Sequence, residues 1–242
     1  MNYKEYPEIG VFKDGLKELK IELTDIQIQQ FMDYYELLVE WNSVMNLTSI
    51  IVFKEVIQKH FIDSLSIVKV LNLSKEKVLD IGTGAGFPGI PLKIAFPEIE
   101  IVLLDSLQKR IYFLDEVVNK LKLEKITTLH GRAEEYGKNE NYREQFDLCV
   151  SRAVAKLSSL SEYCIPYVKN GGYFVPYKSG KIEEELEMSQ NALNILGAKI
   201  IKTGEFSLPG TDIERKLVVI QKVSDTPSKY PRTAGKPTKS PL

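Results

Sequence analysis

The chain has 242 residues, of which 43% are hydrophobic and 27% charged, and its formal net charge is −1. This composition and length are typical of a folded globular protein with one main core, and they exclude a disordered chain. The near-neutral charge means that any nucleic acid would be bound by a local basic patch. No apolar run reaches the ~20 residues that span a bilayer, and the first residues lack a secretory-signal layout, so we expect a cytoplasmic protein outside the membrane.

The first part of the chain has the periodicity of amphipathic helices. Thr24 and Gln27 have the spacing of a capping box, and apolar residues follow at helical spacing through residues 31–45. A second helical pattern covers residues 56–71. We therefore expect residues 1–76 to form a helical extension that packs on the core.

From Lys77 onward, short apolar runs alternate with longer amphipathic ones. The apolar runs are residues 78–81, 101–104, 126–129, 146–150 and 173–177, and the helical patterns between them cover 88–96, 107–121, 156–168 and 182–196. This alternation is typical of βαβ units in a parallel sheet. Two last runs, 199–206 and 215–222, are separated only by a loop, which predicts a terminal antiparallel hairpin. The prediction is an α/β, Rossmann-like core over residues 77–223 with a mostly parallel sheet.

Two smaller features complete the organisation. Residues 224–242 contain four prolines and a basic excess, so we expect a flexible tail without regular structure. The only two cysteines, Cys149 and Cys164, form no CxxC pair, which argues against a disulfide or a zinc site. We expect both to be small core residues, and we expect no metal site.

The sharpest functional signal is the glycine-rich turn at the end of the first predicted strand. It reads Val78-Leu79-Asp80-Ile81-Gly82-Thr83-Gly84-Ala85-Gly86. Glycine is needed in such a turn because a ligand approaches the backbone closely and because the turn adopts conformations that side chains disfavour. A tight turn that binds no ligand is the structural alternative.

The ligand of this turn could be a dinucleotide or S-adenosylmethionine. Gly84, Gly86 and Gly89 spell the GxGxxG pattern of dinucleotide-binding proteins. Asp80, however, is placed to meet the ammonium group of a methionine moiety, directly or through water. The bulky pair that follows the turn, Phe87-Pro88, also leaves little room for a pyrophosphate at the helix N-terminus. The residues thus favour S-adenosylmethionine.

Two later strand ends carry further cofactor candidates. Asp105 ends the second predicted strand, where an acidic side chain accepts hydrogen bonds from both ribose hydroxyls. Its alternative role is to cap the helix that begins near Leu107. After the third strand, Ala133 and Glu134 could offer a backbone amide and a carboxylate to an adenine edge, although the segment alone resembles a solvated helix start.

The fourth strand leads to Arg152, which could hold a methionine carboxylate or an RNA phosphate. The alternative is an ordinary surface arginine. The segment lacks the Asn/Asp-Pro-Pro-Tyr motif typical of enzymes that methylate exocyclic amines, and it lacks the Pro-Cys nucleophile of pyrimidine C5 methylation. What remains is chemistry that needs neither an acceptor clamp nor a covalent intermediate, and guanine N7 fits it because it has an available lone pair and loses no proton on methylation.

Several of these motifs together resemble the RsmG family, also called GidB, from about Thr24 to the hairpin. The resemblance implies an enzyme that uses S-adenosylmethionine to form 7-methylguanosine in bacterial 16S ribosomal RNA. The motifs that carry it are Asn46-Leu47-Thr48-Ser49, His60-Phe61-Ile62-Asp63-Ser64, the turn from Leu79 to Leu92, Leu103-Leu104-Asp105-Ser106, Lys109-Arg110 and Ser151-Arg152-Ala153.

The resemblance also assigns residues. It implies cofactor contacts at Gly82, Phe87, Ala133, Glu134 and Arg152, to which the strand-end reasoning adds Asp80, Gly84, Gly86 and Asp105. Arg152, His60 and Asp63 are the catalytic candidates, since the resemblance suggests that His60 and Asp63 face the active site. A helix-surface pair with an ordinary hydrogen bond is the alternative for these last two.

The expected partner is 16S ribosomal RNA or the small ribosomal subunit, and we expect a monomer. Two competing functions are an NAD-dependent oxidoreductase and a non-enzymatic RNA-binding module. The first lacks a histidine near the predicted hydride site, and the second would not need an intact set of cofactor residues. The basic candidates for RNA contact, taken as a group, are Lys109, Arg110, Lys178, Lys181, Arg215 and the tail.

Overall fold

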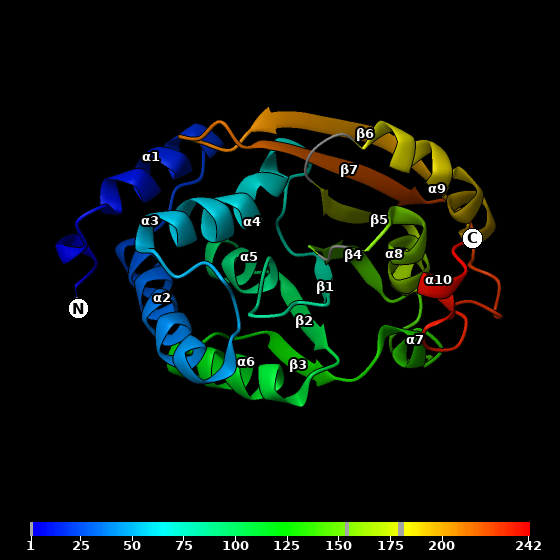
Figure 1. Cartoon of the computed structure of the whole chain (residues 1–242), viewed down its shortest axis with the longest axis horizontal. Helices are drawn as coiled ribbons and strands as arrows, with labels where there is room; N and C mark the ends of the chain where they lie inside the picture. The colour runs from blue at the N-terminus through cyan, green and yellow to red at the C-terminus, as the bar shows by residue number, and fades with distance from the viewer. Residues whose placement is uncertain (1, 153–154, 179–181) are drawn as a thin grey trace.

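The computed structural model describes residues 2–152, 155–178 and 182–242, so the basic candidate Lys181 lies outside the described residues. One sheet of seven strands forms the centre, in the order β3-β2-β1-β4-β5-β7-β6 (Figure 1). β1 to β5 are parallel, and β7 pairs antiparallel with both β5 and β6, which confirms the predicted fold class and its terminal hairpin. The strands are β1 Lys77–Ile81, β2 Glu100–Asp105, β3 Ile126–His130, β4 Phe146–Ser151, β5 Val168–Lys178, β6 Ala198–Ser207 and β7 Glu214–Lys222.

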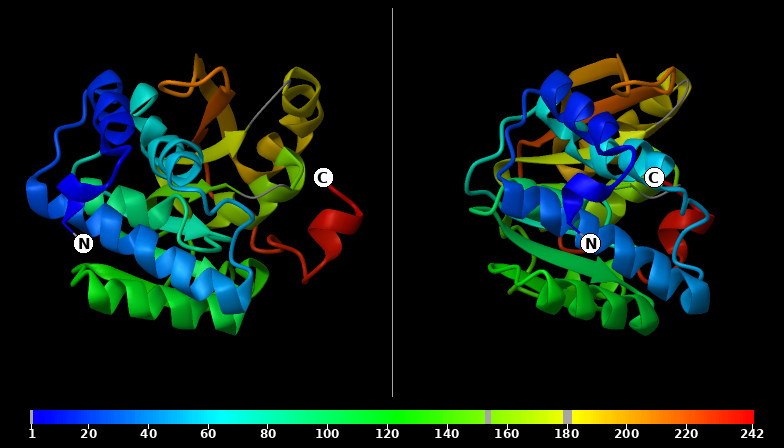
Figure 2. Two further views of the ribbon diagram at one scale, coloured as in Figure 1. Left: turned by 60° about the vertical axis from the view of Figure 1, so that its left-hand side comes forward. Right: turned by 90° about the vertical axis from the view of Figure 1, so that its left-hand side faces the viewer.

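Helices cover both faces of the sheet (Figures 1 and 2). Because successive strand residues point to opposite faces, Val78 packs in one apolar cluster with α1, α2, α5 and α6, whereas Leu79 packs in the other with α8 and α9. The helices are α1 Ile9–Leu19, α2 Asp25–Met45, α3 Phe53–Val56, α4 Asp63–Leu65, α5 Gly89–Ala95, α6 Gln108–Lys120, α7 Ala133–Tyr136, α8 Leu157–Cys164, α9 Glu183–Leu196 and α10 Lys236–Lys239.

The N-terminal extension is helical and shares an apolar cluster with the sheet. The capping box of α2 is present: the Thr24 side chain accepts from the Gln27 backbone N–H at 3.2 Å, and the Gln27 side chain accepts from the Thr24 N–H at 2.9 Å. α1 was not predicted. It begins without a side-chain cap, and Gly15 within it allows close approach to Ile62, because a Cβ there would lie 2.7 Å from the Ile62 Cδ1.

The second predicted helix is a composite. α3 continues through a π-helical segment, Ile57–Ile62, into α4 and then a 3₁₀ turn, Ser66–Lys69. The π-helical segment ends where the catalytic candidates lie, and His60 and Asp63 are both buried. π-helical turns inside helices often occur at functional sites.

The tail differs from its prediction. Residues 236–239 form α10, so the expectation of no regular structure after Ser224 is wrong there. The tail also lies against the core: Arg232 pairs with the buried carboxylate of Glu162, and Arg143 donates to the carbonyl oxygens of Thr226 and Tyr230. The sequence indicated the low apolar content of the tail but not these long-range polar contacts.

Two remaining expectations concern the cysteines and the membrane. Cys149 and Cys164 are both free and buried, as predicted for small core residues. Within the part of the chain that the structure describes, no helix combines the length and apolar character that crossing a bilayer requires.

Candidate functional site

The carboxyl ends of β1 to β4 bring the predicted cofactor residues together. The strand order places β2 and β3 on one side of β1 and β4 on the other, which is the switch point where open α/β sheets bind ligands. The glycine-rich turn follows β1 and Asp105 ends β2. Gly131 follows β3, and Arg152 follows β4.

The glycine turn has the backbone that its sequence predicts. Gly82 and Gly84 have φ values of 69° and 64°, in the left-handed region that glycine adopts without steric penalty. Gly86 is also crowded, because a Cβ there would lie 2.8 Å from the hydroxyl of Tyr34. That hydroxyl donates to the carbonyl of Ala85, so α2 braces the turn from outside the sheet.

Asp80 is completely buried behind the turn. Its Oδ2 accepts from the Thr83 hydroxyl at 2.6 Å and from the Gly89 N–H at 2.9 Å, and this fixes the turn to the start of α5. Its Oδ1 has no hydrogen-bond partner among the described residues. Burial raises the pKa of Asp80 to about 7. A buried acceptor without a donor is costly, so a cationic donor in this place would be stabilising.

Asp105 has the helix-capping role that was its alternative interpretation, and it keeps acceptor positions for a ligand. Its Oδ1 accepts from the Leu107 N–H at 2.9 Å, as a helix cap does, and its Oδ2 accepts from the Gly84 N–H at 2.9 Å. The Arg110 guanidinium also donates to Oδ2 at 3.1 Å. A carboxylate has about four acceptor positions. Two remain for ribose hydroxyls if Arg110 moves away.

A cavity of about 260 Å³ opens at these strand ends. Of the residues predicted to contact the cofactor, Gly82, Asp105, Ala133 and Glu134 line this cavity, whereas Asp80, Gly84, Gly86, Phe87 and Arg152 do not. The full lining is Ile81, Gly82, Leu104, Asp105, Ser106, Arg110, Gly131, Arg132, Ala133, Glu134, Ser151, Ala155, Leu160 and Tyr163.

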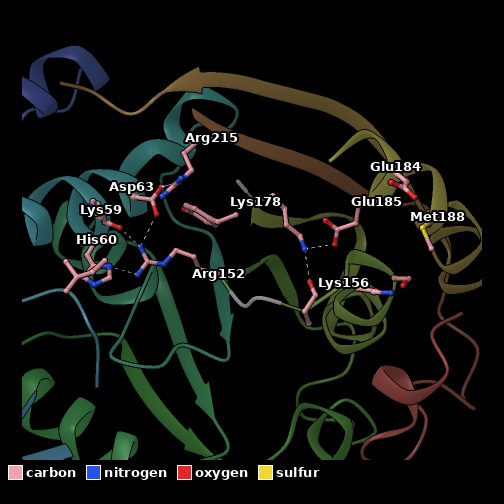
Figure 3. A pocket seen from close by; sticks show the side chains of 14 residues that line it. Lys59, His60, Asp63, Arg152, Lys156, Lys178, Glu184, Glu185, Met188 and Arg215 are labelled. Carbon is pink, nitrogen blue, oxygen red and sulfur yellow. Dashed lines mark hydrogen bonds and ion pairs between the residues drawn. The ribbon is translucent and has the colours of Figure 1, made fainter. Parts of the chain in front are cut away.

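A second, larger cavity of about 750 Å³ shares Ala155 with the first (Figure 3). All three catalytic candidates line it. They lie together on one side, and Lys178 and Glu185 lie across from them in Figure 3. The lining is Ile50, Lys59, His60, Asp63, Arg152, Ala155, Lys156, Ser158, Tyr177, Lys178, Glu184, Glu185, Met188 and Arg215.

Arg152 is the centre of the group of catalytic candidates. Its Nη1 donates to the Lys59 carbonyl at 3.1 Å and to the Asp63 Oδ2 at 3.0 Å, and its Nη2 donates to the His60 Nδ1 at 3.0 Å. Its guanidinium carbon also lies 4.9 Å from the centre of the Phe87 ring. Arg152 is therefore fixed by its neighbours and is not the ordinary surface residue of the alternative interpretation.

The contacts of His60 define its protonation state. A guanidinium only donates hydrogen bonds, so Nδ1 must accept from Arg152, which leaves the proton on Nε2, 3.0 Å from the Thr48 hydroxyl. Burial, with the nearby charge of Arg152, lowers the pKa of His60 to about 3. The imidazole also stacks on Phe87 with 4.4 Å between ring centres. His60 is thus a neutral positioning group with both nitrogens engaged.

Asp63 joins two arginines. Its Oδ2 accepts from Arg152, and its Oδ1 accepts from the Arg215 Nε at 2.7 Å. The helix-surface interpretation of His60 and Asp63 is wrong, because both are buried and both contact Arg152. The sequence did not reveal this arrangement, since Asp63 and Arg215 are 152 positions apart.

Sequence reasoning also missed two residues that support the site. Tyr34 braces the glycine turn, and Thr48 orients His60. Thr48 belongs to the Asn46-Leu47-Thr48-Ser49 motif that carries the family resemblance, so a signal was present without a role. Tyr34 lies in a regular apolar pattern, where nothing distinguishes it from other core residues.

The basic candidates for RNA contact divide into two places. Lys178 and Arg215 line the larger cavity, where Lys178 pairs with Glu185 and Arg215 with Asp63. Arg110 lines the smaller cavity, and the neighbouring Lys109 donates to the Met45 carbonyl at 3.2 Å.

The sequence profile of the family described as GidB, rRNA small subunit methyltransferase G, matches residues 27–217. The chain is 56% identical to a protein named ribosomal RNA small subunit methyltransferase G from Lachnoclostridium phytofermentans, over 96% of this chain and 97% of that protein. It is 50% identical to a protein of the same name from Acetivibrio thermocellus, over the whole of both chains.

Solved structures agree on the fold. A SAM-dependent methyltransferase from Aquifex aeolicus superposes with a TM-score of 0.51 at 17% identity, over 69% of this chain and 93% of that one. This likeness concerns the fold, whereas the family is established by the sequence match. The chain therefore belongs to the GidB family, rRNA small subunit methyltransferase G, and is a methyltransferase.

Proposed function

We propose that this chain transfers the methyl group of S-adenosylmethionine to N7 of a guanine in 16S ribosomal RNA of the small ribosomal subunit. In this proposal the smaller cavity takes the cofactor and the larger cavity takes the target base. The shared residue Ala155 makes the two cavities neighbours, as transfer between two bound molecules requires.

Residues that line the smaller cavity, together with Asp80 behind the glycine turn, fit the cofactor. The Asp80 Oδ1 is buried without a partner behind the turn, which suits an ammonium group approaching directly or through water. Gly82 exposes backbone to the cavity, and Asp105 supplies charged acceptors for hydroxyl groups. Glu134 supplies a carboxylate for an adenine amine. When bound, the cofactor supplies an activated methyl group.

The network of Arg152, His60 and Asp63 supports guanine N7 as the atom that accepts the methyl group. His60 is neutral with its Nδ1 occupied, and both oxygens of Asp63 accept from arginines, so none of these three groups is free to remove a proton. Methylation of an exocyclic amine must release a proton to a base, whereas guanine N7 attacks through a lone pair and loses none. A site built for orientation alone therefore suits N7.

The charges around the larger cavity favour a nucleic-acid substrate. Arg152, Arg215 and Lys156 line it, and Asp63 is the carboxylate that orients the first two. Arginines held in this way can bind phosphates with little further loss of side-chain freedom. The protein would hold the RNA backbone there while the base enters the cavity.

We further infer that the enzyme acts as a monomer in the cytoplasm, outside the membrane. Its exposed large apolar side chains include Ile26, Ile201 and Val223, which lie on α2, on β6 and directly after β7. Scattered single residues of this kind are normal for a monomer surface.

The test is methylation of ribosomal RNA with labelled cofactor, followed by borohydride and aniline, which cleave the chain at 7-methylguanosine. We expect label and cleavage at one guanine in a loop or bulge, because the deep major groove of an RNA duplex hides N7. Label without cleavage would exclude N7 as the acceptor. Absence of label from both free RNA and small subunits would refute the whole proposal.

A further inference from the structure

The C-terminal strap, defined as residues 226–240, lies outside the segment that matches the family profile. It runs beside α7 and α8 and carries α10 (Figure 1). We propose that this strap is part of the cofactor site, where it positions the cavity wall that meets the adenine end of S-adenosylmethionine. The inference rests on the proposed function, which assigns the smaller cavity to the cofactor.

Two residues that line the smaller cavity are bonded to the strap. Glu134 is buried, and its Oε1 accepts from the Gly235 N–H at 3.2 Å. The hydroxyl of Tyr163 shares a hydrogen bond with the Thr238 hydroxyl at 2.8 Å. Glu134 is the residue expected to meet the adenine amine, so the strap fixes the direction of the group that would recognise the base.

A buried ion pair anchors the strap to α8. Glu162 is fully buried, and its Oε1 accepts from the Arg232 backbone N–H at 2.7 Å and from the Arg232 Nε at 2.9 Å. Its Oε2 accepts from the Arg232 Nη2 at 2.6 Å. A planar guanidinium paired in this bidentate manner defines orientation as well as distance. Glu162 and Tyr163 are adjacent, so this anchor directly precedes a residue of the cavity wall.

Two further core residues, Arg143 and Ser159, hold the strap. Arg143 donates to the Thr226 carbonyl at 2.6 Å and to the Tyr230 carbonyl at 2.8 Å, while Ser159 donates to the Pro237 carbonyl at 2.8 Å. A segment that served only as a solvated basic arm would not need hydrogen-bond partners on the core. The geometry thus assigns the strap a positioning role rather than only the RNA contact suggested by its charge.

Coupling between strap and cofactor is reciprocal, so it can be measured from both sides. In the wild-type protein, saturating S-adenosylhomocysteine should slow amide hydrogen exchange in residues 232–240. In the Arg232→Ala variant, the dissociation constant for S-adenosylhomocysteine should rise at least about fivefold, the lower end of common coupling energies. Arg232→Lys should restore part of this loss, and the KM for the cofactor should change more than kcat.

Lys239→Ala is the matched control, because Lys239 is an exposed tail cation with no side-chain hydrogen bond to the described residues. It should leave the cofactor dissociation constant unchanged. If Arg232→Ala fails to fold because Glu162 is left unpaired, Ser159→Ala loosens the strap more gently and should also weaken binding.

Unchanged hydrogen exchange on ligand binding would overturn the inference. So would a folded Arg232→Ala variant that binds S-adenosylhomocysteine as the wild type does, or equal losses in Arg232→Ala and Lys239→Ala. If the wild type itself does not bind the ligand, the proposed function fails, and the inference with it. The two failures are therefore distinguishable.

Discussion

Arg152 donates a hydrogen bond from Nη2 to the Nδ1 of His60 at 3.0 Å, and this contact keeps the imidazole neutral. Protonation of Nδ1 would place two donors face to face, beside a fixed positive charge. Burial and the charge of Arg152 together lower the pKa of His60 to about 3. A pairing of this kind orients the arginine without offering a proton acceptor to the substrate.

The first prediction concerns this histidine. The chain has two histidines, so His130→Gln leaves His60 as the only imidazole for nuclear magnetic resonance. Its ring signals should not shift between pH 5 and 8, and the signals should identify the Nε2–H tautomer. A titration midpoint near the ordinary value of about 6.5 would contradict the geometry. It would also reopen His60 as an acid or base.

The second prediction tests whether Arg152 acts by geometry or by charge. Arg152→Lys keeps the positive charge but loses the planar fork that contacts Asp63 and His60, so kcat should fall about 10- to 100-fold. Lys156→Ala is the control in the same cavity, and it should raise the KM for RNA with a smaller effect on kcat. Normal turnover by the lysine variant would show that charge alone suffices. Methyl transfer to small subunits measures both.

The third prediction concerns Asp105 and Arg110, whose substitution should change ligand affinity in opposite directions. Asp105→Ala should weaken S-adenosylhomocysteine binding about 10- to 100-fold, since a hydrogen bond to a charged group contributes roughly 1.5–3 kcal/mol. Arg110→Ala should instead strengthen binding a few-fold, because Arg110 occupies acceptor positions of Asp105. Calorimetry of S-adenosylhomocysteine binding measures the dissociation constant of each variant. Weaker binding in Arg110→Ala would mean that Arg110 assists the ligand, and no change in Asp105→Ala would remove Asp105 from the cofactor site.

The fourth prediction follows from the burial of Asp80, which raises its pKa to about 7. If the ionised carboxylate meets the ammonium group, affinity for S-adenosylhomocysteine should fall by up to about tenfold per pH unit below pH 7. For the free protein the sign is opposite: the stabilisation from the protonated carboxyl is full below the unfolded value of 3.8 and is lost as the pH rises through 7. Asp80→Asn should abolish both dependences. A pH-independent wild-type affinity between pH 5.5 and 7.5 would exclude the proposed contact.

The parts of the fold that were predictable from sequence have local causes. The capping box at Thr24 satisfies backbone donors within one turn, and the strand pattern follows from the alternation of residues such as Val78 and Leu79 between two apolar clusters. The glycine turn has its own local requirement, which is a positive φ at Gly82 and Gly84. In each case the physical reason lies within a few residues of the signal.

The parts that were missed depend on distant partners. α1 contains Gly10 and Gly15, which weaken its helical pattern, and the close contact of Gly15 with Ile62 explains the second glycine. The anchor of the strap joins Arg232 to Glu162 across 70 positions. Composition correctly indicated few apolar residues in the tail. The ion pair between Arg232 and the buried Glu162 nevertheless holds the tail against the core.

The residues of the candidate site also divide into those with a local sequence signal and those that depend on distant partners. Strand ends and the glycine turn indicated four of the residues that line the smaller cavity, including Gly82 and Asp105. Their spacing could not reveal that Arg110 covers Asp105, because that contact depends on the side-chain direction at the start of α6. Nor could it distinguish a neutral His60 from a titrating one, since the difference arises from Arg152, 92 positions away.

The contact between Tyr34 and the glycine turn has a consequence for how the protein can be divided. Tyr34 donates to the Ala85 carbonyl, and its ring packs against Phe61 and Phe87. A fragment that begins at Lys77 and contains only the Rossmann-like core would lack Tyr34. Its glycine turn would therefore lose this hydrogen bond, and Phe87 would be exposed to water. Attempts to build a smaller methyltransferase from this chain, or to exchange its first half with that of a distant relative, should retain Tyr34 and the aromatic residues around it.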